Sequence, residues 1–202
     1  MVKRKLLIAT GSKGKFPEII SLLDGLPFQF LNLRDISKLP VDYEVEEPGM
    51  TFEGNAVIKA MTIGNKTGLL TLAEDAGLEV DALSGRPGVY TARYGPGTDK
   101  DRYEKLLKEL QGVPDERRTA RFKAVIAIYD PKNNKVRTCE GSYEGRISIK
   151  PVGTNGFGYD PVFFSSALQK TSAQMTLEEK NSISHRGVAL RKAREILQKE
   201  FV

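Results

Sequence analysis

The sequence predicts an α/β fold, in which apolar strands alternate with amphipathic helices. Residues 5–10 and 69–73 are short apolar runs typical of buried strands, and residues 16–23 and 52–63 carry apolar side chains at helical spacing. The chain has 202 residues, of which 40% are hydrophobic and 28% are charged, enough for one sizeable core or two small lobes. Because no repeat, low-complexity tract or linker interrupts it, we expect a single domain over residues 1–202.

Charge, cysteine content and the N-terminal residues narrow the class of protein. The formal net charge is +5 and the isoelectric point is near 9.2, which favours an anionic partner without choosing between nucleotides and nucleic acid. The lone cysteine, Cys139, cannot form an intramolecular disulfide and is interpreted as a buried small side chain, which fits a reducing cytosol. The apolar run before Gly11 is too short for a signal peptide or a membrane span. We therefore expect a cytoplasmic protein with no membrane partner.

The first quarter of the chain predicts a strand, a glycine loop, a helix and a second strand. The apolar run 5–10 stops at Gly11, and the helical pattern of residues 16–23 follows. A glycine and proline turn then leads into a strand over residues 28–33. Residues 35–50 contain two prolines and a cluster of acids, so we expect an exposed loop or a pair of short edge segments there.

The strand over residues 69–73 is followed at once by two acids, Glu74 and Asp75. Ligand crevices of open α/β sheets lie beyond the carboxyl ends of strands, so these carboxylates are candidates for a site. Side chains alternate between the two faces of a strand, so both acids can point at one site only if the chain turns, and Gly77 offers such a turn. The alternative is a solvated strand end without a function.

The remaining elements follow from the same periodicities. In the helix over residues 52–63, the polar side chains of Asn55 and Lys59 share one face. Later in the chain we expect a helix over 99–110, a hairpin of strands over 121–129 and 136–142, a further strand over 145–152 and a terminal helix over 188–201.

The segment TGSKGK, residues 10–15, is the first candidate for a binding site. It combines backbone N–H groups, two lysines and the N-terminus of the following helix, which are the ingredients of an anion site. It is not a P-loop, because only two residues separate Gly11 from Gly14. The alternative is an ordinary glycine turn between a strand and a helix.

Two further segments contain residue types that can carry chemistry. In GFGYDP, Phe157 or Tyr159 could stack on a base and Asp160 could accept a hydrogen bond from a ring N–H, although a tight turn with core aromatics would look the same. His185 lies beside Arg186 just before the terminal helix. It is the only histidine, so multi-histidine metal sites are excluded and any metal must take oxygen ligands. A lone histidine near a helix start is also commonly structural.

With these residues, the chain resembles the inosine triphosphate pyrophosphatase family, whose members hydrolyse deaminated purine nucleoside triphosphates. Five motifs occur in the family's order and span nearly the whole chain: ATGSKGK, EEPGMTFEGNAVIKA, LAEDAGLEVDALSGRPGVYTARY, GFGYDPVFF and EEKNSISHRG. Each motif is modest, but the ordered set is specific. The resemblance implies two lobes around an elongated mixed β-sheet with flanking helices, a nucleotide cleft between the lobes, and a homodimer.

The resemblance also implies a role for each matching position. Asp75 matches a metal ligand and general base, Glu46 matches a second ligand of the implied Mg²⁺, and Ala76 matches a neighbouring substrate contact. The other matches to substrate-binding positions are Thr10, Gly11, Ser12, Lys13, Gly14 and Lys15 in the triphosphate loop, Lys59 at the phosphates, and Phe157, Gly158, Tyr159, Asp160, Lys180, His185 and Arg186 at the nucleoside.

Four positions depart from the family's pattern. Ser12 stands where an asparagine is common, Glu74 where an aspartate is common, and Ala76 where a serine is frequent. Gly54 stands where a glutamate is usual, so the role of that glutamate has moved or been lost, and the adjacent Glu53 is not included in the predicted site.

The resulting hypothesis is hydrolysis of ITP, dITP and XTP between the α- and β-phosphates, which keeps these nucleotides out of DNA and RNA. Mg²⁺ held by Asp75 and Glu46 would act as a Lewis acid, Asp75 would deprotonate a water, and the lysines would stabilise the pyrophosphate. Which of Glu46, Glu47 and Glu74 completes the metal shell stays open at this stage.

The choice of base follows from hydrogen-bond chemistry. Arg186 is donor-only and His185 can donate, so this pair would favour the 6-oxo group of hypoxanthine or xanthine over the 6-amino group of adenine. How guanine is rejected is not explained by these residues. A related pyrophosphatase for modified pyrimidines is one rival reading. The other is a nucleic-acid binding module that uses Phe157 or Tyr159, which would have no need for metal carboxylates. We therefore expect no stable nucleic-acid partner.

Overall fold

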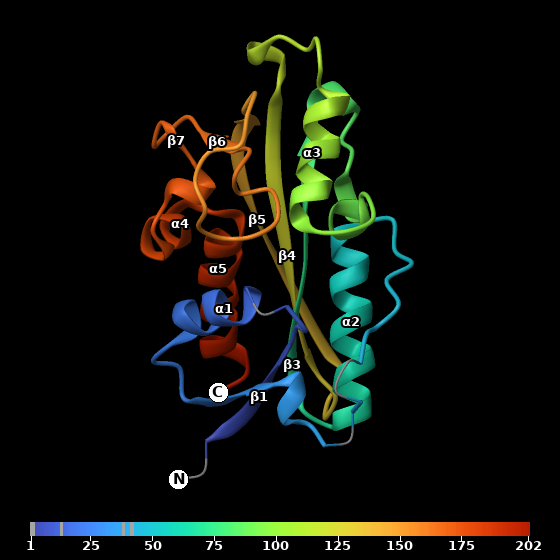
Figure 1. The fold of residues 1–202 in the computed structure, drawn as a ribbon. Helices are drawn as coiled ribbons and strands as arrows, with labels where there is room; N and C mark the ends of the chain where they lie inside the picture. The colour runs from blue at the N-terminus through green and yellow to red at the C-terminus, as the bar shows by residue number, and fades with distance from the viewer. Residues whose placement is uncertain (1–2, 13, 38, 41–42) are drawn as a thin grey trace. The chain divides into compact units, whose positions relative to one another are not determined.

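A computed structural model describes residues 3–12, 14–37, 39–40 and 43–202 and confirms the α/β class (Figure 1). One seven-stranded sheet has the order β2-β1-β3-β4-β5-β6-β7. The strands are β1 (Arg4–Ala9), β2 (Phe28–Asn32), β3 (Leu70–Val80), β4 (Thr119–Asp130), β5 (Lys135–Ile147), β6 (Phe163–Ser165) and β7 (Lys170–Thr171). The α-helices are α1 (Lys15–Leu23), α2 (Phe52–Thr67), α3 (Asp99–Glu109), α4 (Leu177–Ile183) and α5 (His185–Glu200).

The chain divides into two compact units, and β3, β4 and β5 each contribute to both. Unit 1 comprises Met1–Asp75, Ala124–Gly141 and Arg186–Val202. Unit 2 comprises Ala76–Lys123 and Ser142–His185.

Unit 1 is built on parallel strands that are covered by helices on both faces. β1 pairs in parallel with both β2 and β3, in a register that sets Ile8 opposite Leu72 and Ala9 opposite Ala73. In Figure 1, α1 and α5 lie on one face of these strands and α2 lies on the other. Strands covered on both faces are apolar throughout, which is why residues 6–9 are all buried.

Unit 2 has its own hydrophobic core. Its strands include antiparallel pairs, with β6 between β5 and β7. Leu106 of α3 and Leu110, which follows the helix directly, pack with Leu78, Phe122 and Phe163 in one buried cluster. Thr98 caps the N-terminus of α3 by accepting a hydrogen bond from the backbone N–H of Asp101. The predicted role of this helix in core packing is therefore confirmed.

Several predicted boundaries were wrong. The chain does not turn after Asp75, because β3 continues without interruption to Val80. The two strands expected over 136–142 and 145–152 are a single strand, β5, and residues 148–162 that follow contain no strand. The terminal helix begins at His185 rather than at residue 188. Helix α4 was not anticipated, because its seven residues are too few to display a periodic pattern.

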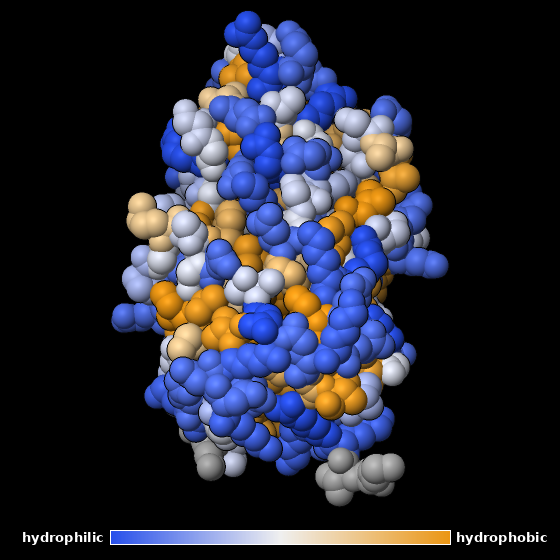
Figure 2. Space-filling model, turned by 180° about the vertical axis from the view of Figure 1, so that it is seen from behind, coloured by the Kyte–Doolittle hydropathy of each residue, from blue (hydrophilic) through white to orange (hydrophobic). Residues whose placement is uncertain are grey.

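The loop between η1 (Leu33–Asp35) and α2 agrees with the prediction of an exposed, irregular segment. Its described part over residues 43–50 contains neither helix nor strand. Across the described ranges, no helix has the combination of length and apolarity required to cross a bilayer. Hydrophilic residues cover most of the face seen in Figure 2, with apolar residues visible between them.

Cys139 is only partly buried, whereas the sequence predicts a buried side chain. It lies on β5, half-buried, and its Sγ donates to the backbone oxygen of Ala189 at 3.3 Å. Burial raises the pKa of this thiol to about 11, with the positive charge of Lys192 opposing the shift. A thiol with a raised pKa is a poor nucleophile, so Cys139 is excluded as a catalytic residue.

Candidate functional site

The register of unit 1 places the glycine loop and the two acids at the same edge of the sheet. β1 ends at Ala9, which is paired with Ala73, so Thr10 and Glu74 are the next residues on adjacent parallel strands. This edge is the carboxyl end of the strands, where ligands bind in open α/β sheets. The glycine loop and the two acids, which the sequence predicted as site residues, therefore start from adjacent positions, even though β3 does not end there.

The loop over residues 10–15 is held by its own hydroxyl groups. The Oγ1 of Thr10 accepts from the backbone N–H of Ser12 at 3.2 Å. The Oγ of Ser12 accepts from the backbone N–H of Lys15 at 3.3 Å, at the first turn of α1. Gly11 is exposed, and an added Cβ there would meet no atom within 4 Å. Lys13, predicted to bind phosphate, lies outside the described residues.

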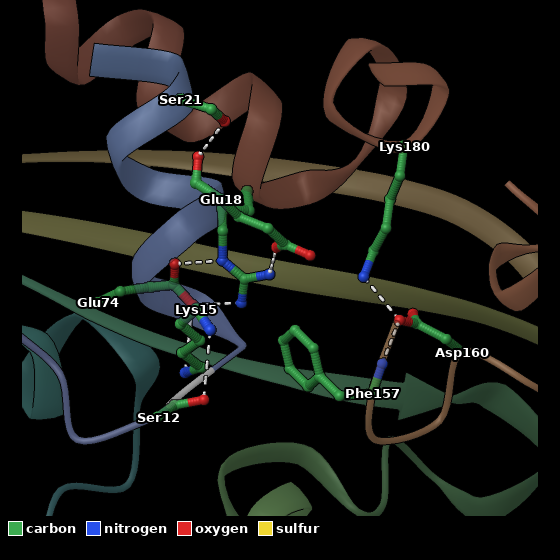
Figure 3. Close-up of polar contacts among 9 residues, drawn as sticks. Ser12, Lys15, Glu18, Ser21, Glu74, Phe157, Asp160 and Lys180 are labelled. Atoms are coloured by element: carbon green, nitrogen blue, oxygen red, sulfur yellow. Dashed lines mark hydrogen bonds and ion pairs between the residues drawn. The ribbon is translucent and has the colours of Figure 1, made fainter. Parts of the chain in front are cut away.

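Glu74 faces α1 and α5 and belongs to a buried network of charges (Figure 3). Its two carboxylate oxygens accept from Nε and Nη2 of Arg186, both at 2.7 Å. The Nη1 of Arg186 donates to Glu18 on α1, and Nζ of Lys15 lies 3.2 Å from Glu74 Oε1. The side chains of Arg186 and Glu74 are only 2% and 1% exposed. Glu74 is therefore committed to this network.

Asp75 faces the other side of the sheet, toward α2. Its Oδ2 accepts from Nδ2 of Asn55 at 3.1 Å, and Asn55 Oδ1 in turn accepts from the backbone N–H of Gly49 at 2.7 Å. A Cβ on Gly49 would lie 2.4 Å from Asn55 Oδ1, so this close approach requires glycine. Asn55 thus connects Asp75 to the loop that precedes α2.

Lys59 lies one turn beyond Asn55 on α2 and contacts two segments at once. Its Nζ donates to the backbone oxygen of Glu74 at 2.9 Å and forms an ion pair with Glu47 Oε1 at 2.6 Å. Glu47 is 22% exposed, whereas the preceding Glu46 is an exposed residue. Since side chains of an extended segment alternate in direction, only one of these two acids can face α2, and it is Glu47.

Burial and charge set the acidity of the groups at this edge. Burial raises the pKa of Asp75, and the positive charge of Lys59 and the hydrogen bond from Asn55 act against that shift. Burial lowers the pKa of Lys15, with Glu74 acting against it. For Arg186 burial acts to lower the pKa, but Glu74 and Glu18 outweigh it and the guanidinium stays charged. A carboxyl with a raised pKa at a sheet edge is a candidate general base.

These residues form what we call the charged cluster, consisting of Lys15, Glu18, Glu47, Lys59, Glu74, Asp75 and Arg186. Three cations face four carboxylates, so the ionised cluster carries one excess negative charge. Within the described part of the chain, no group of three or more His, Cys, Asp or Glu side chains is arranged to hold a metal ion.

In unit 2, the predicted nucleoside residues are organised around Asp160. Its Oδ2 accepts from the backbone N–H of Phe157 at 2.9 Å and from Nζ of Lys180 at 2.6 Å (Figure 3). The same Nζ lies 4.8 Å from the centre of the Phe157 ring, a distance typical of a cation–π contact. A Cβ at Gly156 would come within 2.0 Å of Asp160 Oδ2, so this turn requires glycine there.

The two aromatic residues of this turn have different surroundings. Tyr159 is 3% exposed, its Oη donates to the backbone oxygen of Thr91, and burial raises its pKa. It belongs to the core of unit 2, as the simpler interpretation of this segment proposed. Phe157 is only half-buried. His185 stacks on the ring of Phe122, with centroids 4.8 Å apart and planes inclined by 14°.

Comparison with known proteins identifies the family. Residues 6–196 match the model of the Ham1 family. The chain belongs to the Ham1 family. The matched range includes the residues of the charged cluster and of the turn around Asp160.

Relatives and solved structures of the Ham1 family match this chain along its length. A protein of Desulforamulus reducens named dITP/XTP pyrophosphatase is 48% identical over 98% of both chains. One of Geobacter sulfurreducens with the same name is 51% identical over 92% of both. The structure of a HAM1 protein from Coxiella burnetii has a TM-score of 0.87 at 38% identity, covering 97% of this chain and 99% of the other. The Staphylococcus aureus Ham1 protein has a TM-score of 0.86 at 34% identity, covering 98% of this chain and 100% of the other. The inosine-triphosphatase-like fold predicted from the motifs is therefore confirmed.

Three residues of these clusters were absent from the sequence prediction. Asn55 was noted only as a member of the polar face of its helix, one turn from Lys59, and that spacing was the available signal. Glu18 lies in the first turn of α1, where acids are common because they interact favourably with the helix dipole, so its sequence position does not indicate a site. Asp99, which contacts the turn of Phe157 through Gly158, is far from that turn in sequence.

Proposed function

We propose that this protein is a nucleoside triphosphate pyrophosphatase that hydrolyses ITP, dITP and XTP to the monophosphate and pyrophosphate. The observation that carries the proposal is the similarity over 98% of both chains to a relative named dITP/XTP pyrophosphatase, at 48% identity. The site at the sheet edge supports it, because a buried carboxylate, two lysines and a glycine loop are the parts that this reaction requires.

The charged cluster and the loop over residues 10–15 would bind the triphosphate. The nitrogen atoms of Lys15 and Lys59 are now paired with Glu74 and Glu47, so incoming phosphate oxygens would compete with carboxylates for them. Lys13 is proposed to act with them on the evidence of its sequence position alone. Backbone N–H groups at the start of α1 supply further donors for phosphate.

The residues of the charged cluster fit a divalent cation bound together with the substrate. A triphosphate would bring several negative charges to a cluster that already holds four carboxylates, so a cation bound with it would offset their mutual repulsion. Mg²⁺ uses one or two carboxylates and completes its shell with phosphate oxygens and water, so a group of three protein ligands is not required. We propose Asp75 and Glu47 as the carboxylates. Glu46 matched this role by sequence, but Glu47 is the acid that faces Lys59.

The chemical step would use Asp75 as the general base. The oxygen of a water forms a bond to the α-phosphorus, and its proton passes to the carboxylate of Asp75. The bond from the α-phosphorus to the bridging oxygen breaks, and its electron pair leaves with pyrophosphate. Burial raises the pKa of Asp75 and so makes it a stronger base, while Asn55 fixes its orientation. A bound Mg²⁺ would supply Lewis-acid stabilisation of the phosphate charge.

The residues around Asp160 would contact the base. Phe157 supplies a half-buried ring for stacking, and Lys180 and His185 supply donors for a 6-oxo group. Tyr159 supports the turn from the core. Arg186 was predicted to read the base directly, and three of its N–H groups are given to Glu74 and Glu18. We therefore propose that Arg186 organises the two acids, and its contact with the base is proposed on the resemblance alone.

Several finer properties remain proposals that rest on the resemblance. We propose a single catalytic domain over residues 1–202, a homodimer, a cytoplasmic location, and contacts of Ala76 and Gly158 with the substrate through their backbone. We also propose that the protein has no stable nucleic-acid partner, because a nucleic-acid binding module would have no need for the carboxylates of the charged cluster.

The experiment that tests this proposal is a substrate panel. Pyrophosphate release is measured for ITP, XTP, dITP, GTP, ATP and a modified pyrimidine triphosphate, with Mg²⁺ and with chelator. We expect metal-dependent release from ITP, dITP and XTP and little from ATP. Release concentrated on the pyrimidine nucleotide would favour the related pyrophosphatase, and strong salt-dependent binding of oligonucleotides without release would favour the binding module.

A further inference from the structure

The turn that carries Phe157 is held from α3 by a carboxylate that has no assigned role. Oδ2 of Asp99 accepts from the backbone N–H of Gly158 at 2.7 Å, across 59 residues of sequence. Oδ1 of the same carboxylate accepts from Nη2 of Arg102 in the next turn of the helix. Each oxygen therefore has its own partner, and the carboxylate is oriented between them.

This contact acts on a turn that also has an internal backbone hydrogen bond, in which the N–H of Asp160 donates to the oxygen of Phe157 at 3.3 Å. Gly156 and Gly158 have φ values of +77° and +63°, a conformation that glycine adopts without strain and other residues avoid. Phe157 lies between these two glycines, so besides the contact of its ring with Lys180, its direction depends on how the neighbouring peptide groups are held. The carboxylate of Asp160 accepts from the backbone N–H of Phe157, and the carboxylate of Asp99 accepts from the backbone N–H of Gly158.

We infer that Asp99 is a positioning residue for the base-stacking ring of Phe157. It acts by holding the Gly158 peptide on one side of Phe157 while Asp160 holds the other side. The inference rests on the proposed function, in which Phe157 stacks on the purine base. It extends that function by assigning part of base recognition to the N-terminal turn of α3, which none of the predicted site residues occupies.

The mechanism predicts a specific kinetic signature. Loosening the turn should weaken the stacking of the base and leave the groups at the phosphates untouched, because those groups belong to unit 1. The KM for ITP should therefore rise while kcat changes little. One charge-assisted hydrogen bond of a partly exposed carboxylate corresponds to about a three- to tenfold change in affinity.

Asp101 provides a matched control on the same helix. It is also an acid in the first turn of α3, and its Oδ2 accepts from the backbone N–H of Thr98 at 2.6 Å without contacting Gly158. Replacing either acid by alanine removes one negative charge from the helix N-terminus. Asp99→Asn is the conservative variant, since an amide oxygen can still accept from Gly158 but carries no charge.

The test measures KM and kcat for ITP in the wild type, Asp99→Ala, Asp99→Asn and Asp101→Ala, together with the amide proton shift of Gly158 by NMR. In Asp99→Ala we expect a raised KM for ITP and an upfield shift of the Gly158 amide proton. In Asp99→Asn both values should return most of the way to those of the wild type. Asp101→Ala should have the KM and the amide shift of the wild type. Equal KM values in Asp99→Ala and Asp101→Ala would overturn the inference. So would equal effects of Asn and Ala at position 99, which would indicate a role of charge alone.

The same experiment separates failure of this inference from failure of the proposed function. If the wild type releases no pyrophosphate from ITP, the proposed function is wrong and the assigned role in base binding falls with it. If the wild type cleaves ITP and the Asp99→Ala chain moves only the Gly158 amide, the proposed function stands and Asp99 is merely structural.

Discussion

Arg186 donates from Nε and Nη2 to the two carboxylate oxygens of Glu74, each at 2.7 Å, and 112 residues of sequence separate the pair. The adjacent Asp75 points to the opposite face of β3 and contacts Asn55 instead. Two adjacent acids of β3 therefore lie in different environments: Glu74 is neutralised by Arg186, and Asp75 is not part of that pair. The alternation of side chains along β3 is the physical basis of this separation.

The pair between Arg186 and Glu74 should be essential to stability. Removing one partner leaves the other charge buried without compensation, so we expect Arg186→Ala to lower the free energy of unfolding by about 3–5 kcal/mol. Lys199→Ala is the matched control on α5, since its ion pair with Glu195 is exposed, and it should cost at most about 0.5 kcal/mol. Urea unfolding monitored by circular dichroism gives both values. If Arg186→Ala lowers the free energy of unfolding by less than about 1 kcal/mol, the buried pair does not stabilise the fold as proposed.

The choice between Glu46 and Glu47 as a metal ligand can be made with two variants. We expect Glu47→Gln to raise the Mg²⁺ concentration needed for half-maximal pyrophosphate release by about tenfold or more, because even indirect partners of a metal have effects of that size. Glu46→Gln should change it less than about twofold, since Glu46 is exposed. A magnesium titration at fixed ITP measures both. The reverse order of effects would restore the assignment made from the motif.

Asn55 should matter for activity more than for stability. Loss of its bonds to Asp75 and Gly49 frees the carboxylate and the loop, so we expect Asn55→Ala to lower kcat/KM by about tenfold or more. Asn65→Ala is the control on the same helix, because the side chain of Asn65 accepts from Tyr129 and does not contact the site. Steady-state rates with ITP decide the question. Equal rates in the two variants would remove Asn55 from the site.

The raised pKa of Asp75 has a consequence for stability. A carboxyl whose pKa is raised by folding costs no stability while it is protonated, below its unfolded pKa, and destabilises increasingly as the pH rises through its folded pKa. Asp75→Asn removes this cost, so we expect its Tm without metal to exceed that of the wild type at pH 7. The difference in Tm should vanish as the pH falls below about 4, where Asp75 is protonated in both the folded and the unfolded state. Thermal melts between pH 4 and 8 test the sign, and a lower Tm at pH 7 would contradict it.

Cys139 should react slowly in the folded protein. With its pKa raised to about 11 against an ordinary value of 9.0, the thiolate fraction at pH 8 is lower by about 100-fold, and burial slows access further. The rate with a thiol reagent is measured in buffer and in urea, where the chain is unfolded and serves as its own control. Similar rates in both conditions would show that the thiol is neither buried nor shifted.

Features that depend on neighbouring residues in the sequence could be predicted, whereas contacts between residues far apart in the sequence could not. The strand over residues 5–10, the glycine loop and helix α1 were predicted because strand and helix periodicities are local. The extension of β3 through Glu74 and Asp75 was missed, because two acids and a glycine are typical of a strand end. Their partners, Arg186 and Asn55, compensate for the buried acids and come from distant helices that no local pattern reveals.

The candidate site shows the same limit. The motifs suggested candidate residues, but they could not say which of two adjacent acids faces Lys59. Glu46 and Glu47 are equivalent in sequence, and only the ion pair of Glu47 with Lys59 separates them. Asp99 could not be predicted either, because its partner is the backbone N–H of Gly158, and every residue except proline has such a group. Side chains that act on backbone atoms are therefore the part of a site that motifs predict least well.

The most direct test of the proposed activity is to separate binding from turnover in Asp75→Asn. Binding of ITP with Mg²⁺ is measured by calorimetry, and pyrophosphate release is measured in the same buffer with and without chelator. We predict that the variant still binds ITP while its kcat falls by about 10²–10⁴-fold, the range expected for loss of a general base. Turnover at the rate of the wild type would contradict the account, because the buried acid at the edge of the sheet would then have no part in the reaction.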